Sequence, residues 1–152
     1  MTVPMVEGSG EAERTGRQYP SDMAGRPLND TEIEAYDVVS PDLARKVRVY
    51  RIRFIPGGYA GMTLGRNVLL TNDVSEDGNS ALMAHELVHA RQWADLGLVG
   101  FSRRYATSFA RNLIKHKRWH AAYRDVDAEV EARNETTDWL RRKTRDGLAD
   151  NV

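Results

Sequence analysis

Two histidines four residues apart, with a glutamate directly after the first, are the residues best suited to chemistry. They are His85, Glu86 and His89, within the segment H-E-L-V-H. On an α-helix, residues four apart lie on one face, so both imidazoles can bind one metal ion. Glu86 can then accept a proton from water that the metal activates. The spacing therefore predicts a metal site with His85 and His89 as ligands and Glu86 as catalytic base.

The residues around this motif favour a buried helix. Ser80 can cap its start, Gly97 can end it, and no glycine or proline lies between them. The motif is flanked by A-L-M-A and contains L-V, so apolar side chains would enclose it. The alternative is an ordinary amphipathic helix with both histidines and the glutamate on its surface. The apolar flanks favour the metal-binding helix over that alternative.

A catalytic zinc ion needs a third protein ligand beyond the two histidines. Glu129, on a later helical segment with Val126 and Val130 nearby, is the best candidate. Alternatively, Glu129 and Glu131 are surface acids on a charged helix. A site with only two protein ligands would be under-coordinated, and this favours Glu129 as the ligand.

A second histidine pair, His116 and His120, is also spaced by four residues and could bind a metal or supply the third ligand. No acidic residue lies between them, and Lys115, Lys117 and Arg118 surround them. Positive charge disfavours a cation site, so we interpret this pair as part of a basic, exposed helix face.

The amino-acid composition disfavours several classes of partner and site. The 152 residues suit one domain, and 22 basic residues balance 22 acidic ones, so overall charge favours neither nucleic acid nor an anionic membrane as partner. Without cysteine the chain forms no disulfide and no thiolate zinc site. The first residues do not resemble a Sec signal, and no apolar run reaches the roughly 20 residues of a membrane span. These features suit the cytoplasm or export by a non-Sec route.

The pattern of residues predicts an α+β domain over residues 28–145, with tails at 1–27 and 146–152. Glycine, serine and proline punctuate the N-terminal tail, which we expect to be flexible. We expect a small antiparallel sheet with the helices on one side. In chain order the expected elements are short helices at 29–36 and 41–46, a strand at 47–55 with a bulge near Val49 and Tyr50, a hairpin of 61–64 and 67–70, and helices at 80–96, 101–117 and 127–143, with a break at 117–124.

The segments H-E-L-V-H-A-R-Q-W and E-V-E-A-R together resemble a known family. They are similar to compact bacterial zincin-type domains that carry H-E-L-x-H-x-x-Q and then E-x-E-A-D. These include uncharacterised core domains attached to effectors of extracellular contractile injection systems; gluzincin metallopeptidases are more distant. The resemblance covers about residues 47–140. It implies a zincin-like fold, one zinc ion held by His85, His89 and Glu129, Glu86 as base, and a secretion apparatus as an expected partner.

The chain departs from the gluzincin pattern at Arg133, where those enzymes have an aspartate. In the family that aspartate orients a ligand histidine by accepting its second ring proton. Asp127 and Glu131 are the residues nearby that could replace it.

Two functions follow from these observations. The first is a zinc-dependent endopeptidase that hydrolyses protein or peptide substrates. The second is a non-catalytic zinc-binding module that serves in interaction or effector packaging. Glu86 favours the enzyme, because a purely structural zinc site has no need of a base. For the enzyme, Tyr105, His120 and Tyr123 are candidate oxyanion donors, and the strand at 61–64 is the candidate edge for aligning an extended peptide.

Overall fold

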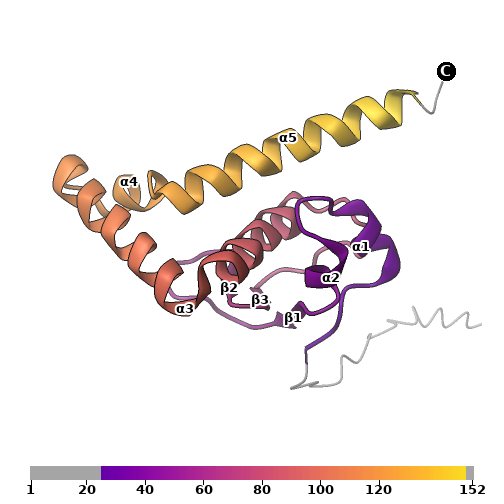
Figure 1. Cartoon of the computed structure of the whole chain (residues 1–152), viewed down its shortest axis with the longest axis horizontal. Helices are drawn as coiled ribbons and strands as arrows, with labels where there is room; N and C mark the ends of the chain where they lie inside the picture. The colour runs from indigo at the N-terminus through magenta and orange to yellow at the C-terminus, as the bar shows by residue number, and fades with distance from the viewer. Residues whose placement is uncertain (1–24, 150–152) are drawn as a thin grey trace, which may run out of the picture.

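The fold, taken from a computed structural model that describes residues 25–149, is α+β with a small three-stranded mixed sheet (Figure 1). Most of the expected N-terminal tail therefore lies outside the described residues. The elements are α1 (Asp30–Ala35), α2 (Pro41–Ala44), β1 (Arg48–Arg51), β2 (Gly61–Leu64), β3 (Asn67–Leu70), α3 (Ala81–His116), α4 (Trp119–Arg124) and α5 (Asp127–Ala149). None of the described helices combines the length and apolar character needed to cross a membrane.

The strands lie in the order β1-β3-β2, with β3 in the centre. β2 and β3 form the expected antiparallel hairpin, in which Gly65 has a φ of 64°. β1, however, pairs with β3 in parallel, so the expectation of an antiparallel sheet was wrong. β3 takes the centre because its Val68 and Leu70 are both buried, and the nine residues 52–60 let the chain pass that position on its way to β2.

β1 is shorter than the expected strand and has no bulge. Its register with β3 is continuous from Arg48 to Arg51. The irregular sequence pattern has another cause: Val49 faces the core, while the ring of Tyr50 covers Gly25 on the other side. Arg26 also pairs through its backbone with Val49 in an antiparallel bridge, so contacts with the sheet begin before residue 28.

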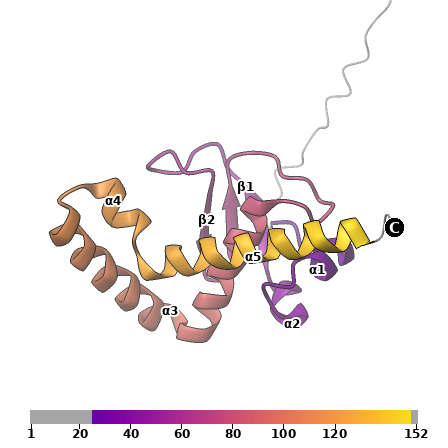
Figure 2. The ribbon, with the colours of Figure 1, turned by 90° about the horizontal axis from the view of Figure 1, so that it is seen from above.

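α3 is two helical segments that meet at Gly97 without a loop. Ser80 caps the start as expected, because its hydroxyl accepts a hydrogen bond from the Met83 N–H at 3.1 Å. Gly97 has φ 67° and ψ 175°, which ends the first segment and turns the chain. We call residues 81–96 the inner arm and residues 98–116 the outer arm; Figure 2 shows the change in direction between them.

The inner arm of α3 lies between the sheet and α5, and contacts both. α5 crosses over it and runs on past α1 (Figures 1 and 2). Two anchors fix this arrangement in the core: Trp139 of α5 packs on Tyr36 and donates its indole N–H to the Ala35 carbonyl at 2.9 Å. The core therefore ties α5 to the end of α1, and α5 also packs against the helix that carries the H-E-x-x-H motif.

The segment expected as a break, 117–124, contains the short helix α4. Lys117 takes a left-handed conformation with φ 53°, which ends the outer arm and turns the chain into α4. α5 then begins at Asp127, as expected, but continues to Ala149 instead of ending at residue 143. It thus includes part of the expected C-terminal tail.

Candidate metal centre

His85, His89 and Glu129 converge on one point, and the group is largely buried. The two Nε2 atoms lie 3.2 Å apart, and each lies 3.5 Å from one of the two Glu129 carboxylate oxygens. Zinc bonds of about 2.1 Å in a tetrahedral arrangement would separate ligand atoms by roughly 3.4 Å. The three side chains therefore fit a metal ion, as the sequence predicted for these residues.

The hydrogen bonds around His89 leave its inward nitrogen ready to bind a cation. His89 Nδ1 lies 2.8 Å from Gln92 Oε1, while the Gln92 amide nitrogen donates to the Ala128 carbonyl at 3.1 Å. The amide oxygen can only accept, so Nδ1 carries a proton, and the inward Nε2 is the ring nitrogen that can bind a metal ion. Gln92 thereby orients one ligand and also ties the inner arm to the residue before Glu129.

The charge state of Glu129 matches this role. Burial raises its pKa, but hydrogen bonds from His85 and His89, with a further one from Tyr123, outweigh burial and lower the pKa far below its ordinary value. Burial lowers the pKa of His89, and the hydrogen bond with Glu129 reverses this and raises it. A carboxylate and two imidazole nitrogens that face one another this closely favour a shared cation, which can be a proton or a metal ion.

Glu86 lies beside the cluster and is 4% exposed. Burial raises the pKa of its carboxyl group, against the lowering effects of His89, Thr63 and His85. The Thr63 hydroxyl on β2 lies 2.8 Å from the carboxylate and 3.0 Å from the Glu86 backbone carbonyl. A Cβ atom at Gly61 would come within 2.5 Å of the carboxylate, so any larger residue there would displace the Glu86 side chain. β2 thus positions the candidate base from the sheet side.

A cavity of about 380 Å³ gives access to the cluster, with all three candidate ligands and Glu86 in its wall. Tyr123 lines the cavity and forms a hydrogen bond with Glu129. Tyr105 forms a hydrogen bond with Tyr123. Burial, then the charge of Glu129, raises the pKa of Tyr123, so its hydroxyl stays protonated and can donate. On the sheet side, the Trp93 indole N–H donates to the Thr63 carbonyl at 3.1 Å.

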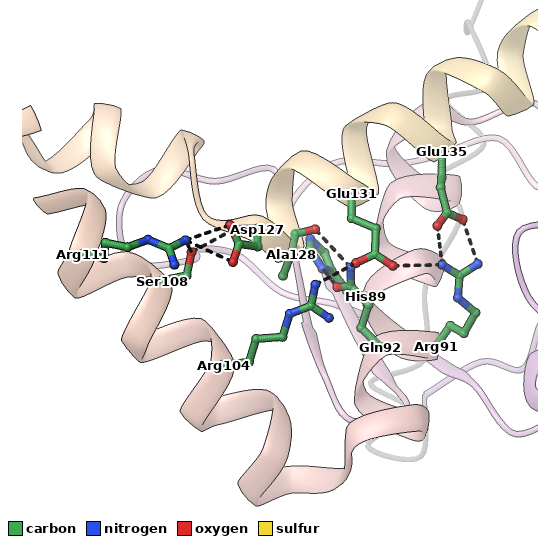
Figure 3. A network of polar contacts seen from close by, with 10 residues as sticks. All are labelled: His89, Arg91, Gln92, Arg104, Ser108, Arg111, Asp127, Ala128, Glu131 and Glu135. Carbon is green, nitrogen blue, oxygen red and sulfur yellow. Dashed lines mark hydrogen bonds and ion pairs between the residues drawn. The ribbon is translucent and has the colours of Figure 1, made fainter. Parts of the chain in front are cut away.

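Polar contacts between α3 and α5 hold Glu129 in place (Figure 3). Arg91 of the inner arm pairs with Glu135 at 2.5 Å, and Arg104 of the outer arm pairs with Glu131 at 3.3 Å. Ser108 accepts a hydrogen bond from the Asp127 backbone N–H at 3.1 Å, which fixes the first turn of α5. Glu129 lies in that same turn, so both arms of α3 determine its position.

Neither Asp127 nor Glu131 takes the place of the aspartate that gluzincins have at the position of Arg133. Asp127 pairs with Arg111, and Glu131 pairs with Arg91 and Arg104. Arg133 donates to the Arg124 carbonyl, away from the cluster. The orienting residue is Gln92, which accepts the proton of His89 from three residues along the same helix.

The second histidine pair does not join the metal cluster. His116 Nε2 lies 2.8 Å from Asp125 Oδ2, a close ion-pair contact without hydrogen-bond geometry, and its side chain is only 25% exposed. His120 is exposed and lines a different cavity. The exposed-face interpretation therefore holds for His120, whereas His116 is half-buried and paired with an acid.

Three residues in contact with the site carried no distinct signal in the sequence: Thr63, Tyr59 and Trp93. Thr63 is 23 positions from Glu86, and only the packing of β2 against α3 brings the two residues together. Gln92 could have been found, since the i, i+3 spacing from His89 places both on one helix face.

Comparison with known protein families, curated proteins and solved structures finds no match to this chain.

Proposed function

We propose that the protein is a zinc-dependent endopeptidase of the zincin type. The single observation that carries the proposal is the position of Glu86. A buried carboxylate with a raised pKa lies beside three metal-binding side chains, and all four line one cavity. A site that only stabilised the fold would need neither the cavity nor the additional carboxylate.

The donor set supports zinc, because two imidazoles and one carboxylate are the ligands of many catalytic zinc sites. When bound, zinc would supply a Lewis acid and lower the pKa of water. Glu86 is placed to accept a proton from water and transfer it to the leaving amine. Tyr123 is the proposed oxyanion donor; Tyr105 lines the same cavity and hydrogen-bonds Tyr123, whereas His120 is outside this cavity.

The edge position of β2 supports a peptide as substrate. Leu64 and Asn67 close a two-residue hairpin, so the backbone groups of Gly61 and Thr63 point away from β3. The Trp93 indole N–H donates to the Thr63 carbonyl. The other outward backbone groups of Gly61 and Thr63 can align an extended chain beside Glu86. The sequence resemblance to zincin-type domains of injection-system effectors agrees with this reading and suggests a secretion apparatus as a partner.

Replacing Glu86 by Gln tests the proposal. The substitution keeps the size of the side chain and its contact with Thr63 but removes the base. Because general-base help contributes about 10²–10⁴-fold in rate, we expect cleavage of an unstructured protein to fall at least about a hundredfold. Zinc content and melting temperature should match those of the parent. Both proteins are assayed with a quenched peptide library, and zinc is measured by elemental analysis.

The same experiment distinguishes the alternative, a non-catalytic zinc-binding module for interaction or packaging. A parent that is fully loaded with zinc and cleaves neither the protein nor any peptide of the library supports that module. Equal zinc-dependent cleavage by the parent and Glu86→Gln would instead remove Glu86 from the mechanism.

A further inference from the structure

A second and larger cavity, of about 780 Å³, adjoins the metal cavity. Four residues belong to the walls of both: Tyr59, Tyr105, Ala106 and Tyr123. One of them, Tyr123, hydrogen-bonds the candidate ligand Glu129. A chain bound at the metal cluster can therefore place a neighbouring side chain in the second cavity.

The walls of the second cavity come from three separate parts of the fold. The connection between β1 and β2 supplies Tyr59, and Figure 2 shows this connection reaching toward α4. The outer arm of α3 supplies Phe109, and α4 supplies Trp119. Gly57, with φ 89°, lets the Tyr59 ring pack against the backbone, where a Cβ atom would come within 2.5 Å of it. The cavity is thus built by a local turn together with packed rings.

Two aromatic pairs determine the character of this space. Tyr59 and Tyr123 have ring centroids 4.9 Å apart, and Phe109 and Trp119 have centroids 4.6 Å apart in an edge-to-face arrangement. Among the described residues that line the cavity there is no carboxylate, lysine or arginine. A cationic side chain would find no acid among these lining residues, and a carboxylate could meet only the imidazole of His120, whereas an aromatic ring could add edge-to-face or offset contacts to either pair.

We propose that this cavity is a specificity pocket for an aromatic side chain of the peptide substrate, adjacent to the bond that is cleaved. That the bound peptide is a substrate rests on the proposed peptidase function. The pocket itself can be tested without catalysis. Ala106 is the critical wall residue, since its small, exposed side chain lies on the outer arm between the two cavities.

The first experiment measures binding by the full chain carrying Glu86→Gln, so that turnover does not interfere. N-acetyl-phenylalaninamide is titrated while the indole N–H signals of the three tryptophans are followed by NMR. We expect a saturable shift for Trp119 and none for Trp139, which is 1% exposed and bonded to Ala35. N-acetyl-alaninamide and N-acetyl-aspartamide should give no saturable shift. Saturation by either of these at the same concentration as the phenylalanine compound would overturn the inference.

The second experiment fills the pocket. Ala106→Leu adds bulk in the shared wall, and Ala94→Leu makes the same change at an exposed position of the inner arm outside both cavities. Ala106→Leu should abolish the Trp119 shift, whereas Ala94→Leu should keep it. A shift that survives in Ala106→Leu would show that the compound binds elsewhere, and this contradicts the pocket.

The third experiment uses cleavage by the zinc-loaded parent. Peptides with phenylalanine next to the cleaved bond should have a kcat/KM at least about tenfold above those with alanine. They should exceed leucine peptides about 2- to 10-fold, the contribution of ring–ring contacts. Ala106→Leu should reduce the ratio of phenylalanine to alanine at least about tenfold. Cleavage without an aromatic preference would contradict the specificity pocket and still support the peptidase function. Binding of the phenylalanine compound without any cleavage would contradict the peptidase function and still support an aromatic-binding pocket.

Discussion

The two arms of α3 follow one another across Gly97 without a loop, yet they are held in different ways. The inner arm has eight buried residues, from Met83 to Gln92, and the outer arm has three: Phe101, Ser108 and Asn112. The inner arm is packed between the sheet and α5 through apolar side chains. The outer arm is joined to α4 and α5 by polar contacts, part of which Figure 3 shows, and by a smaller apolar cluster of Phe101, Val126 and Ala128.

This difference separates two tasks. The candidate ligands and base on the inner arm have rotamers locked by close packing, which suits a site that must hold atoms within a fraction of an ångström. The outer arm forms one wall of the proposed aromatic pocket, where the shape of the space matters more than the position of a single atom. Substitutions should therefore affect metal binding on the inner arm and stability or specificity on the outer arm.

The largest expected effect concerns the point where α5 meets the inner arm. Glu129→Ala removes one of three ligands, and we expect zinc affinity to fall by more than about a hundredfold, the upper end for residues that only orient ligands. Glu131→Ala, two positions along α5, removes an acid that contacts arginines and should leave the affinity unchanged. Competition with a chelating dye measures both. Equal affinities would show that Glu129 is not a ligand.

The convergence of the candidate ligands on the inner arm could be predicted from the sequence because the information is local. Helical spacing alone puts His85 and His89 on one face, and Ser80 and Gly97 bound the segment as expected. Glu129 followed from the ligand count of zinc together with the apolar residues around it. The structure brings these three together, whereas zinc itself and catalysis remain predictions.

What the sequence could not provide depends on contacts between distant segments. The parallel pairing of β1 with β3 reflects which strand has the most buried residues, and no turn motif encodes this. Thr63 and Tyr59 contact the site only because β2 lies at the edge beside the inner arm. The gluzincin pattern also suggested Asp127 or Glu131 as the acid that orients a histidine. In the structure the side-chain amide of Gln92 orients His89.

Gln92 gives the next largest effect, again on the inner arm. Gln92→Leu removes the acceptor for His89 and the donor for the Ala128 carbonyl, and we expect zinc affinity to fall about 10- to 100-fold. Gln92→Glu keeps an acceptor for His89 while losing the donor, so its affinity should remain well above that of Gln92→Leu. The same dye competition ranks the three proteins. If both variants lose affinity equally, the bond to Ala128 matters and the orientation of His89 does not.

A buried polar residue of the outer arm should behave differently. Asn112 is 6% exposed, and its amide donates to the carbonyls of Ala122 and Asp125 in α4 and just after it. Asn112→Ala leaves those carbonyls without this donor, so we expect a loss of about 1–3 kcal/mol in the free energy of unfolding. Zinc affinity should stay within about twofold of the parent, since Asn112 contacts no candidate ligand, and Ser108 rather than Asn112 bonds the first turn of α5. Urea unfolding and dye competition on one preparation provide both values.

The smallest expected effect tests whether the ion pairs of the outer arm contribute at all. Arg104 lies 3.3 Å from Glu131, with the two side chains 44% and 34% exposed. Exposed pairs contribute about 0–1 kcal/mol, and salt screens them. Arg104→Ala should therefore lower the free energy of unfolding by less than about 1 kcal/mol at low salt, and by less still in high salt.

Arg103→Ala is the matched control, because it removes the same charge one residue away. A double-mutant cycle with Glu131→Ala isolates the pair. A coupling energy well above about 1 kcal/mol that persists in high salt would mean that the outer arm is held by charge as firmly as the inner arm is by packing, and the division of tasks between the two arms would fail.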